Sequence, residues 1–153
     1  MHSTEGIILK KTDLGEDGAL FTIYTKDFVK IRALAQGVKK EGAKLKGHLE
    51  PLSLSSVSFV LGKNGERLTH AALNNFWPGI REDYQKLAAA QKIAILVDQE
   101  CLPGEKDEPL WELLAESLLV LDDQTFSSES LVNLIGSFEK NFAACLGYAD
   151  RPR

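Results

Sequence analysis

The sequence predicts an α+β fold in which a five-stranded β-barrel is followed by an all-helical domain. Up to residue 80, short segments rich in β-branched and aromatic residues are separated by turn signals such as GEDG and GKNGE. After WPGI, at residues 77–80, apolar residues instead recur every three or four positions, as in amphipathic helices. This change of period places the boundary near Pro78-Gly79. We therefore expect a barrel over residues 1–79 and a helical domain over residues 80–153.

Five segments are expected to form the strands. They are GIILKKT, ALFTIYTK, VKIRALAQG, LSLSSVSFVLG and RLTHAALNNFW. Asn64-Gly65, between the last two segments, predicts a tight hairpin because both residues tolerate positive φ. Alternation in the third segment assigns Val29 and Ile31 to the core and leaves Lys30 and Arg32 facing solvent. Five short strands match a small closed or partly closed barrel.

Three helices are expected in the second half. The first carries apolar residues from Leu87 to Cys101 at helical spacing and ends near Pro103-Gly104. The second begins at Asp107, a good N-cap residue. Ser128 is expected to cap the third helix, which ends at Gly147. The expected inward residues of the second and third helices are Leu110, Leu114, Leu118, Leu121, Leu131, Leu134, Ile135, Phe138, Phe142 and Cys145.

Charge is divided unevenly along the chain, whose formal net charge is -4. Residues 1–80 hold 11 Lys and Arg against 8 Asp and Glu, whereas the remainder holds 7 against 14. The stretch GVKKEGAKLKGHLEP, at residues 37–51, contributes Lys39, Lys40, Lys44 and Lys46 against Glu41, with three glycines that keep it flexible. A basic segment on an acidic body predicts a surface for a polyanion, because nearby charges outweigh distant ones. An ordinary solvated loop is the alternative that charge alone leaves open.

Signatures of catalysis are scarce, and we expect no enzyme activity, no metal and no cofactor. His2, His48 and His70 are scattered, and neither Cys101 nor Cys145 has a neighbour at zinc-ligand spacing. GVKKEGAK differs from a phosphate loop because its lysine is displaced by one position and no Ser or Thr follows. The cysteines are expected to be buried free thiols in the cytoplasm. No apolar run is long enough for a membrane span, and no secretory signal is visible.

Tyr24 is the aromatic residue with a candidate role in binding. It shares the polar alternation of the second segment with Thr22 and Lys26. A surface tyrosine beside basic residues can stack on a nucleobase. The alternative is that Tyr24 packs at the edge of the barrel.

Several pieces in order along the chain resemble the RecO family of bacterial recombination mediators. They are TEGIILKKTDLGE, LFTIYT, VKIRALAQGVKK, KLKGHLEPLS and LGYA. The resemblance implies an OB barrel followed by a helical domain. It further implies binding of single- and double-stranded DNA, annealing of complementary strands, and recombinase loading onto strands coated by single-strand-binding protein, with RecR as partner. Lys30, Lys39, Lys40 and Lys44 match basic positions of the family, and strand alternation adds Arg32.

The chain also departs from the family pattern. Gly18 and Ala19 stand where members often have an acid and a basic residue, and Val29 replaces a common glycine. The family continues through a cysteine-rich segment beyond the point where this sequence stops. The chain is therefore expected to be either a fragment or a naturally short relative.

Together these observations predict a non-enzymatic mediator of DNA repair and recombination. The residues expected to contact DNA are Tyr24, Lys30, Arg32, Lys39, Lys40, Lys44 and Lys46. The alternative is a protein-interaction module without its own DNA binding, because the helical half is acidic. Within the expected helices, Lys86, Lys92 and Lys140 are the lysines placed to meet the acidic tail of a partner.

Overall fold

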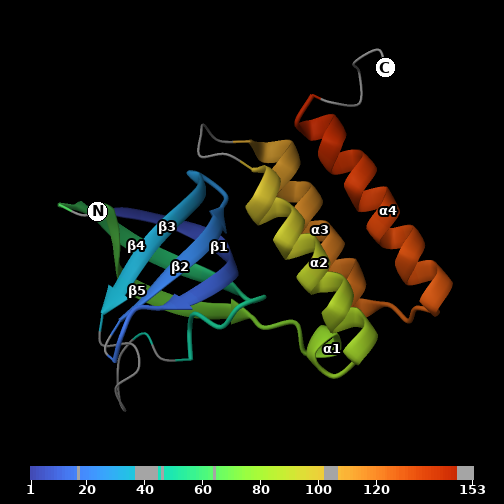
Figure 1. Cartoon of the computed structure of the whole chain (residues 1–153), viewed down its shortest axis with the longest axis horizontal. Coiled ribbons are helices and arrows are strands. Elements are labelled where there is room, and N and C mark those ends of the chain that lie inside the picture. The colour runs from blue at the N-terminus through green and yellow to red at the C-terminus, as the bar shows by residue number, and fades with distance from the viewer. Residues whose placement is uncertain (17, 37–44, 46, 64, 102–106, 148–153) are drawn as a thin grey trace.

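The structure is a computed structural model that describes residues 1–16, 18–36, 45, 47–63, 65–101 and 107–147 (Figure 1). A β-barrel lies beside a group of helices, as the sequence predicted for the fold class. Lys39, Lys40, Lys44 and Lys46 lie outside the described residues. Their expected contacts with DNA therefore stay predictions.

The barrel is closed, with neighbouring strands in the order β1-β2-β3-β5-β4. The strands are β1 (His2–Asp13), β2 (Gly18–Thr25), β3 (Val29–Gln36), β4 (Leu54–Gly62) and β5 (Gly65–Asn75). Neighbours pair antiparallel, except that β3 meets β5 in parallel through the pairs Ala33–Glu66 and Leu34–Arg67. This architecture confirms the expected OB-type barrel.

The barrel interior is filled by alternate residues of the strands and, among the described residues of the β3–β4 connection, by two leucines. Phe21 and Ile23 of β2 pack there with Ile31 of β3, and Leu45 and Leu49 join them from the connection. The alternation predicted for β3 is confirmed, since its odd-numbered residues from Val29 to Ala35 are buried.

The turn between β2 and β3 holds Val29 at a φ of 58°, a left-handed conformation that is costly for a β-branched residue. The Thr25 hydroxyl fixes this turn because it donates to the carbonyl of Val29 at 2.8 Å and accepts from the amide of Phe28 at 2.9 Å. The Val29 side chain is only 4% exposed, so its apolar burial offsets part of the strain.

Four helices follow within the described residues. They are α1 (Pro78–Arg81), α2 (Tyr84–Glu100), α3 (Glu108–Asp123) and α4 (Ser128–Cys145). Asp107 caps α3 as predicted, since its carboxylate accepts from the amide of Leu110 at 3.1 Å. The expected cap of the last helix was wrong by one residue: Ser127 is the N-cap, because it exchanges hydrogen bonds with Ser130 in a capping box.

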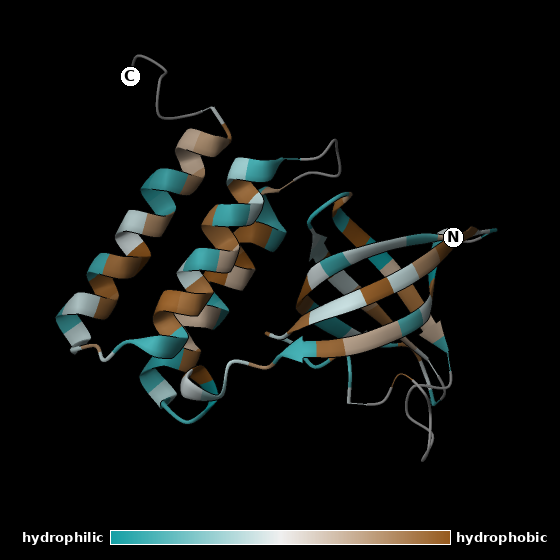
Figure 2. Ribbon diagram, turned by 180° about the vertical axis from the view of Figure 1, so that it is seen from behind, coloured by the Kyte–Doolittle hydropathy of each residue, from teal (hydrophilic) through white to brown (hydrophobic). Residues whose placement is uncertain are grey.

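One hydrophobic core joins the barrel to the helices. It contains Ile7, Tyr24 and Leu52 from the barrel side and Ile93 and Trp111 from the helices. Figure 2 shows α2 and α3 between the barrel and α4, with apolar residues along their length. The outer face of β1 and β2 is therefore covered by helices at one end.

The start of the helical part is held by close backbone packing. A Cβ on Gly79 would lie 2.2 Å from the carbonyl oxygen of Asp122 at the end of α3, so a larger residue would force the backbone apart. The Asp122 carboxylate also accepts from the amide of Ile80 at 3.1 Å. Arg81 donates to the carbonyls of Phe76, Pro51 and Leu52, which ties α1 to the last turn before β4.

Candidate nucleic-acid interface

The outer face of β1, β2 and β3 carries three cross-strand rows of side chains, because paired residues point to the same side of a sheet. In the first row, Ile7 pairs with Tyr24 and Tyr24 with Lys30. The other two rows lie further toward the β1–β2 turn. They are Lys10–Thr22–Arg32 and Thr12–Leu20–Leu34–Arg67.

The first row is buried against the helices, which corrects the expectation that Tyr24 lies on the surface. Tyr24 is 0% exposed and its ring stacks on Trp111, with centroids 6.1 Å apart and planes at 11°. The Tyr24 hydroxyl has no hydrogen-bond partner among the described residues. Burial, followed by the nearby Cys101, Asp107 and Cys145, raises the pKa of Tyr24 well above its usual range. Tyr24 cannot stack on a base in this arrangement.

Replacing Tyr24 with phenylalanine should raise the free energy of unfolding by about 1 kcal/mol, because it removes a buried, unpaired hydroxyl and keeps the ring on Trp111. DNA affinity should stay unchanged. Denaturant unfolding and an oligonucleotide titration of the variant measure both quantities. A weaker affinity for DNA with an unchanged free energy of unfolding would instead indicate that Tyr24 contacts DNA.

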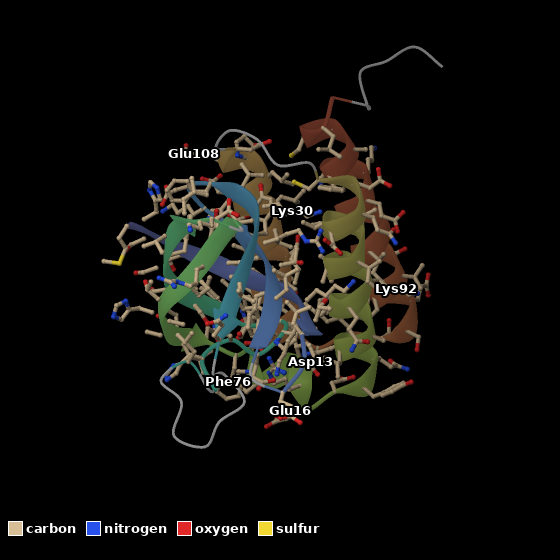
Figure 3. The ribbon with its side chains drawn as sticks, turned by 60° about the vertical axis from the view of Figure 1, so that its left-hand side comes forward. Asp13, Glu16, Lys30, Phe76, Lys92 and Glu108 are labelled. Carbon is tan, nitrogen blue, oxygen red and sulfur yellow. The ribbon has the colours of Figure 1, made fainter. Side chains whose placement is uncertain are left out.

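Lys30 was expected to show its charge to solvent, and the structure corrects this as well. Its ammonium donates to the carbonyl oxygens of Asp98 at 2.6 Å and Cys101 at 3.4 Å, and pairs with the Asp98 carboxylate at 3.2 Å. These carbonyls end α2, where the helix dipole favours a cation. Figure 3 shows Lys30 between the barrel and α2. The lysine joins the two parts of the chain.

Arg32 lies in the next row and is exposed. It belongs to a group that we call the exposed basic face, formed by Lys10, Arg32 and Arg67 of these rows and by Lys63, which lines the same surface hollow as Leu34 and Arg67. Within the described residues, none of the four makes an ion pair or a side-chain hydrogen bond. Leu20 and Leu34, both half-buried, lie in the row beside Arg67. The face therefore combines unpaired cations with a small apolar strip.

Lys30 and Arg32 form a matched pair for mutation, since they lie two residues apart on β3. Lys30→Gln should lower the free energy of unfolding by about 1–2 kcal/mol, because the carbonyls at the end of α2 lose a charged donor. Arg32→Gln should leave stability within about 0.5 kcal/mol. The effects on DNA should be reversed: Arg32→Gln reduces the salt dependence of binding by about 0.7 in the log–log slope, and Lys30→Gln leaves it unchanged. Equal slopes for the two variants would contradict the assignment.

Lys10, Lys63 and Arg67 were missed by sequence reasoning. A β-bulge between Ile8 and Lys10 shifts the alternation of β1, so that simple period-two counting assigns Lys10 to the wrong face. Arg67 joins the face through the parallel β3–β5 pair, which links residues far apart in sequence. The alternation of polar Arg67 and Thr69 with apolar Leu68 is the sequence pattern that could have identified Arg67 as facing outward.

The described residues contain no cluster of three or more His, Cys, Asp or Glu that could hold a metal ion. Burial raises the pKa of both thiols, Cys101 and Cys145; nearby Lys30 opposes the shift at Cys101. Cys101 is buried and Cys145 half-buried, and neither forms a disulfide. These thiols are thereby kept in their protonated, weakly reactive form.

A second surface feature is a groove of about 250 Å³ between α2 and α4. Its apolar lining includes Ile95, Leu96, Ile135 and Phe138, and Lys92 and Glu139 add one charge of each sign. Figure 3 shows Lys92 on the side of α2 away from the barrel. Lys86, by contrast, is buried, with its ammonium 3.4 Å from the carbonyl oxygen of Asp122. Of the lysines expected to meet a partner, Lys86 is therefore unavailable.

No helix among the described residues has the length and apolar character that crossing a bilayer requires.

These features define a class of proteins in which an OB-type barrel with a basic outer face packs on a helical domain. Residues 1–76 match the family model described as Recombination protein O N terminal, and residues 81–150 match Recombination protein O C terminal. The chain therefore belongs to the RecO family.

Curated relatives named DNA repair protein RecO support the same conclusion. The protein of Gloeobacter violaceus is 35% identical over 113 residues, which cover 74% of this chain and 43% of the relative. That of Nostoc sp. is 33% identical over 122 residues, covering 80% and 41%. That of Geobacter metallireducens is 31% identical over 145 residues, covering 95% and 58%. The chain thus spans about half the length of the relatives it matches.

Proposed function

We propose that this chain binds DNA through its exposed basic face and acts in DNA repair as a non-enzymatic recombination mediator. The observation that carries the proposal is the register that places Lys10 and Arg32 in one row and Arg67 in the next, all unpaired within the described residues. Cations on a rigid sheet neutralise phosphates and release counterions without reading sequence. Both single- and double-stranded DNA offer such phosphates. We assign this role to residues 1–79.

The lysines at positions 39, 40, 44 and 46 extend this proposal. They follow Gln36, the last residue of β3, whose strand carries Arg32. Leu45, within the same stretch, is buried in the barrel core and holds the connection to the barrel. We propose that the four lysines contact the phosphates of the same strand, because they are close in sequence to the exposed basic face.

Two further activities are proposed for this chain because it belongs to the RecO family. They are annealing of complementary strands and assistance to recombinase loading, with a RecR-like protein and single-strand-binding protein as partners. Annealing by such a surface needs no nucleotide hydrolysis, because cations that screen phosphate repulsion let complementary bases pair. Helices α2 and α3 cover one end of the barrel face and hold it through Lys30 and Trp111.

A strand-annealing assay tests this function. Two complementary oligonucleotides, one labelled for fluorescence quenching, should anneal faster with the protein, at low salt and without ATP. Phosphate released from ATP in a parallel sample should stay at the level of the buffer. Annealing at the spontaneous rate, or ATP turnover by contaminant-free protein, would contradict the proposal.

The α2–α4 groove supports a second candidate, a protein-interaction module without DNA binding. The apolar lining of the groove suits the hydrophobic residues of a peptide such as the tail expected for single-strand-binding protein, and Lys92 offers a partner for one acidic residue, while Glu139 in the same lining opposes a second. Lys140, exposed on α4, is the other available lysine. Fluorescence anisotropy of a labelled acidic tail peptide distinguishes the two candidates. Peptide binding without DNA binding would favour the module.

A further inference from the structure

The α2–α4 groove lies on a side of the helical part that is turned away from the barrel. Figure 2 shows α4 as the helix furthest from the barrel, and Figure 3 shows Lys92 of the groove pointing away from the strands. α2 and α4 begin side by side, since the Gln85 side-chain amide donates to the Ser128 hydroxyl at 3.3 Å. They run in the same direction, because the groove is lined by residues further along both helices.

Apolar side chains on this face stay exposed in the single chain. Ile95 on α2 is 55% exposed, and Val132 on α4 is 68% exposed. Val132 and Ile135 lie three residues apart on α4, and Lys92 and Ile95 lie three apart on α2, so each pair shares one face of its helix. Covering such side chains with a partner removes apolar surface from water and is favourable.

The charge of the groove differs from that of the helical part as a whole. From residue 81 onward the chain holds 7 Lys and Arg against 14 Asp and Glu, and this excess of acid repels a second copy. The groove, however, is lined by one lysine, Lys92, and one glutamate, Glu139. Both are exposed, and neither has an ion pair or a side-chain hydrogen bond with another described residue. Two acidic chains can therefore approach each other at this locally neutral face.

The two charges are placed so that the face is complementary to itself. Counted from the contact between the two helix starts, Lys92 on α2 is level with Ile135 on α4, and Ile95 is level with Glu139 to within one residue. Lys92 and Glu139 thus occupy diagonal corners of the groove. A two-fold axis lying across the groove exchanges these corners, so each copy's lysine faces the other copy's glutamate. The exposed apolar side chains then lie between the two pairs of helices.

We propose that the α2–α4 groove is the interface of a two-fold dimer of this chain, in which Lys92 of each copy pairs with Glu139 of the other. Contacts of Ile95, Val132 and Ile135 supply most of the affinity, because exposed ion pairs contribute little, and the charges fix the orientation. Glu139 opposes an acidic peptide in the groove but has a cation to meet in the dimer. Each helix is only about 25 Å long, so the interface is small and the dimer is weak and concentration-dependent.

The dimer has a consequence for strand annealing, and this consequence rests on the proposed DNA binding. Because the groove is turned away from the barrel, the exposed basic faces of both copies stay open. Two complementary strands, one on each barrel, are then held by one assembly, which raises the concentration of each strand around the other. Annealing should therefore increase and decrease with the amount of dimer.

Sedimentation velocity of the DNA-free protein over a range of concentrations tests the dimer. Wild-type protein should approach twice the mass of one chain as its concentration rises. Lys92→Glu and Glu139→Lys should each weaken self-association by at least about tenfold, because the two-fold axis places like charges opposite each other twice. An equal mixture of the two variants should associate as wild type does, since each variant then meets opposite charges on the other. Glu116→Lys, which makes the same charge change at an exposed position of α3, is the matched control and should associate as wild type does.

The outcomes separate the dimer from the proposed function. Loss of association in both single variants with recovery in their mixture supports the dimer and excludes misfolding as the cause. Wild-type protein that stays monomeric overturns the dimer, whether or not it binds the acidic tail peptide, and so does a Lys92→Glu variant that associates as wild type does. An oligonucleotide titration measures DNA binding independently: a monomer that binds DNA removes the dimer alone, whereas a dimer that binds no DNA removes the proposed function alone.

The strand-annealing assay tests the consequence with the same proteins. Lys92→Glu should lose acceleration of annealing while its affinity for one labelled strand stays that of wild type, and the mixture with Glu139→Lys should regain the acceleration. Equal annealing by wild type and by a monomeric Lys92→Glu variant would contradict the link between the dimer and annealing.

Discussion

Replacing Trp111 with alanine is expected to lower the free energy of unfolding by about 3–5 kcal/mol, the usual cost of removing a large aromatic side chain from a core. Trp111 is buried on α3 and stacks on Tyr24 of β2, so its side chain packs the helices against the barrel face. Its removal leaves a cavity at the place where the two parts of the chain meet. Tyr24 would then have an empty space above its ring.

Urea unfolding of the purified protein measures this loss from the midpoint and slope of the transition. Leu119→Ala is the matched control, because Leu119 is an exposed residue on the same helix. It should change stability by less than about 0.5 kcal/mol. A loss of under about 1 kcal/mol for Trp111→Ala would mean that Trp111 contributes little to holding the barrel against the helices.

The second large effect concerns two sets of cations. Replacing Lys10, Arg32 and Arg67, which we call the barrel set, with glutamine should reduce the slope of log affinity against log salt by up to about 2 on single strands, at about 0.7 for each phosphate. Replacing Lys39, Lys40, Lys44 and Lys46, the lysine set, in the same way should reduce the slope by up to about 3. Both sets should weaken binding to different sequences by similar factors, since phosphates carry no sequence information.

Stability should change little in the barrel set, because all three side chains are exposed and unpaired within the described residues. Titrations at several salt concentrations give both slopes. An unchanged slope for the barrel set with a reduced slope for the lysine set would confine the contact to residues 39–46. The opposite result would leave those lysines as part of a solvated connector.

Much of the fold was predictable because its signals are local. Asn64-Gly65 marked the β4–β5 hairpin, and the cap at Asp107 marked the start of α3. The alternation of β3 gave its buried face correctly, since neighbouring residues of one strand need no distant partner to be assigned. The error at Ser127 arose because Ser127 and Ser128 are equally good caps by type, and only the bond to Ser130 separates them.

The candidate site was less predictable because it depends on what covers the outer face of the barrel. Alternation assigned Tyr24 and Lys30 outward, which is correct for the barrel, but the helices cover that end of the face. Nothing in the spacing of β2 or β3 indicates that Trp111 and the end of α2 lie against them. Lys10 and Arg67 were missed for the related reason that a bulge and a parallel strand pair set their positions.

The most direct test of DNA binding is a titration of the wild-type protein with a labelled single-stranded oligonucleotide at a series of salt concentrations. We expect binding at low salt that weakens linearly on a log–log plot, with a negative slope of at least about 2 if three barrel cations each neutralise one phosphate. Absence of binding at low salt, or an affinity that does not change with salt, would contradict the account.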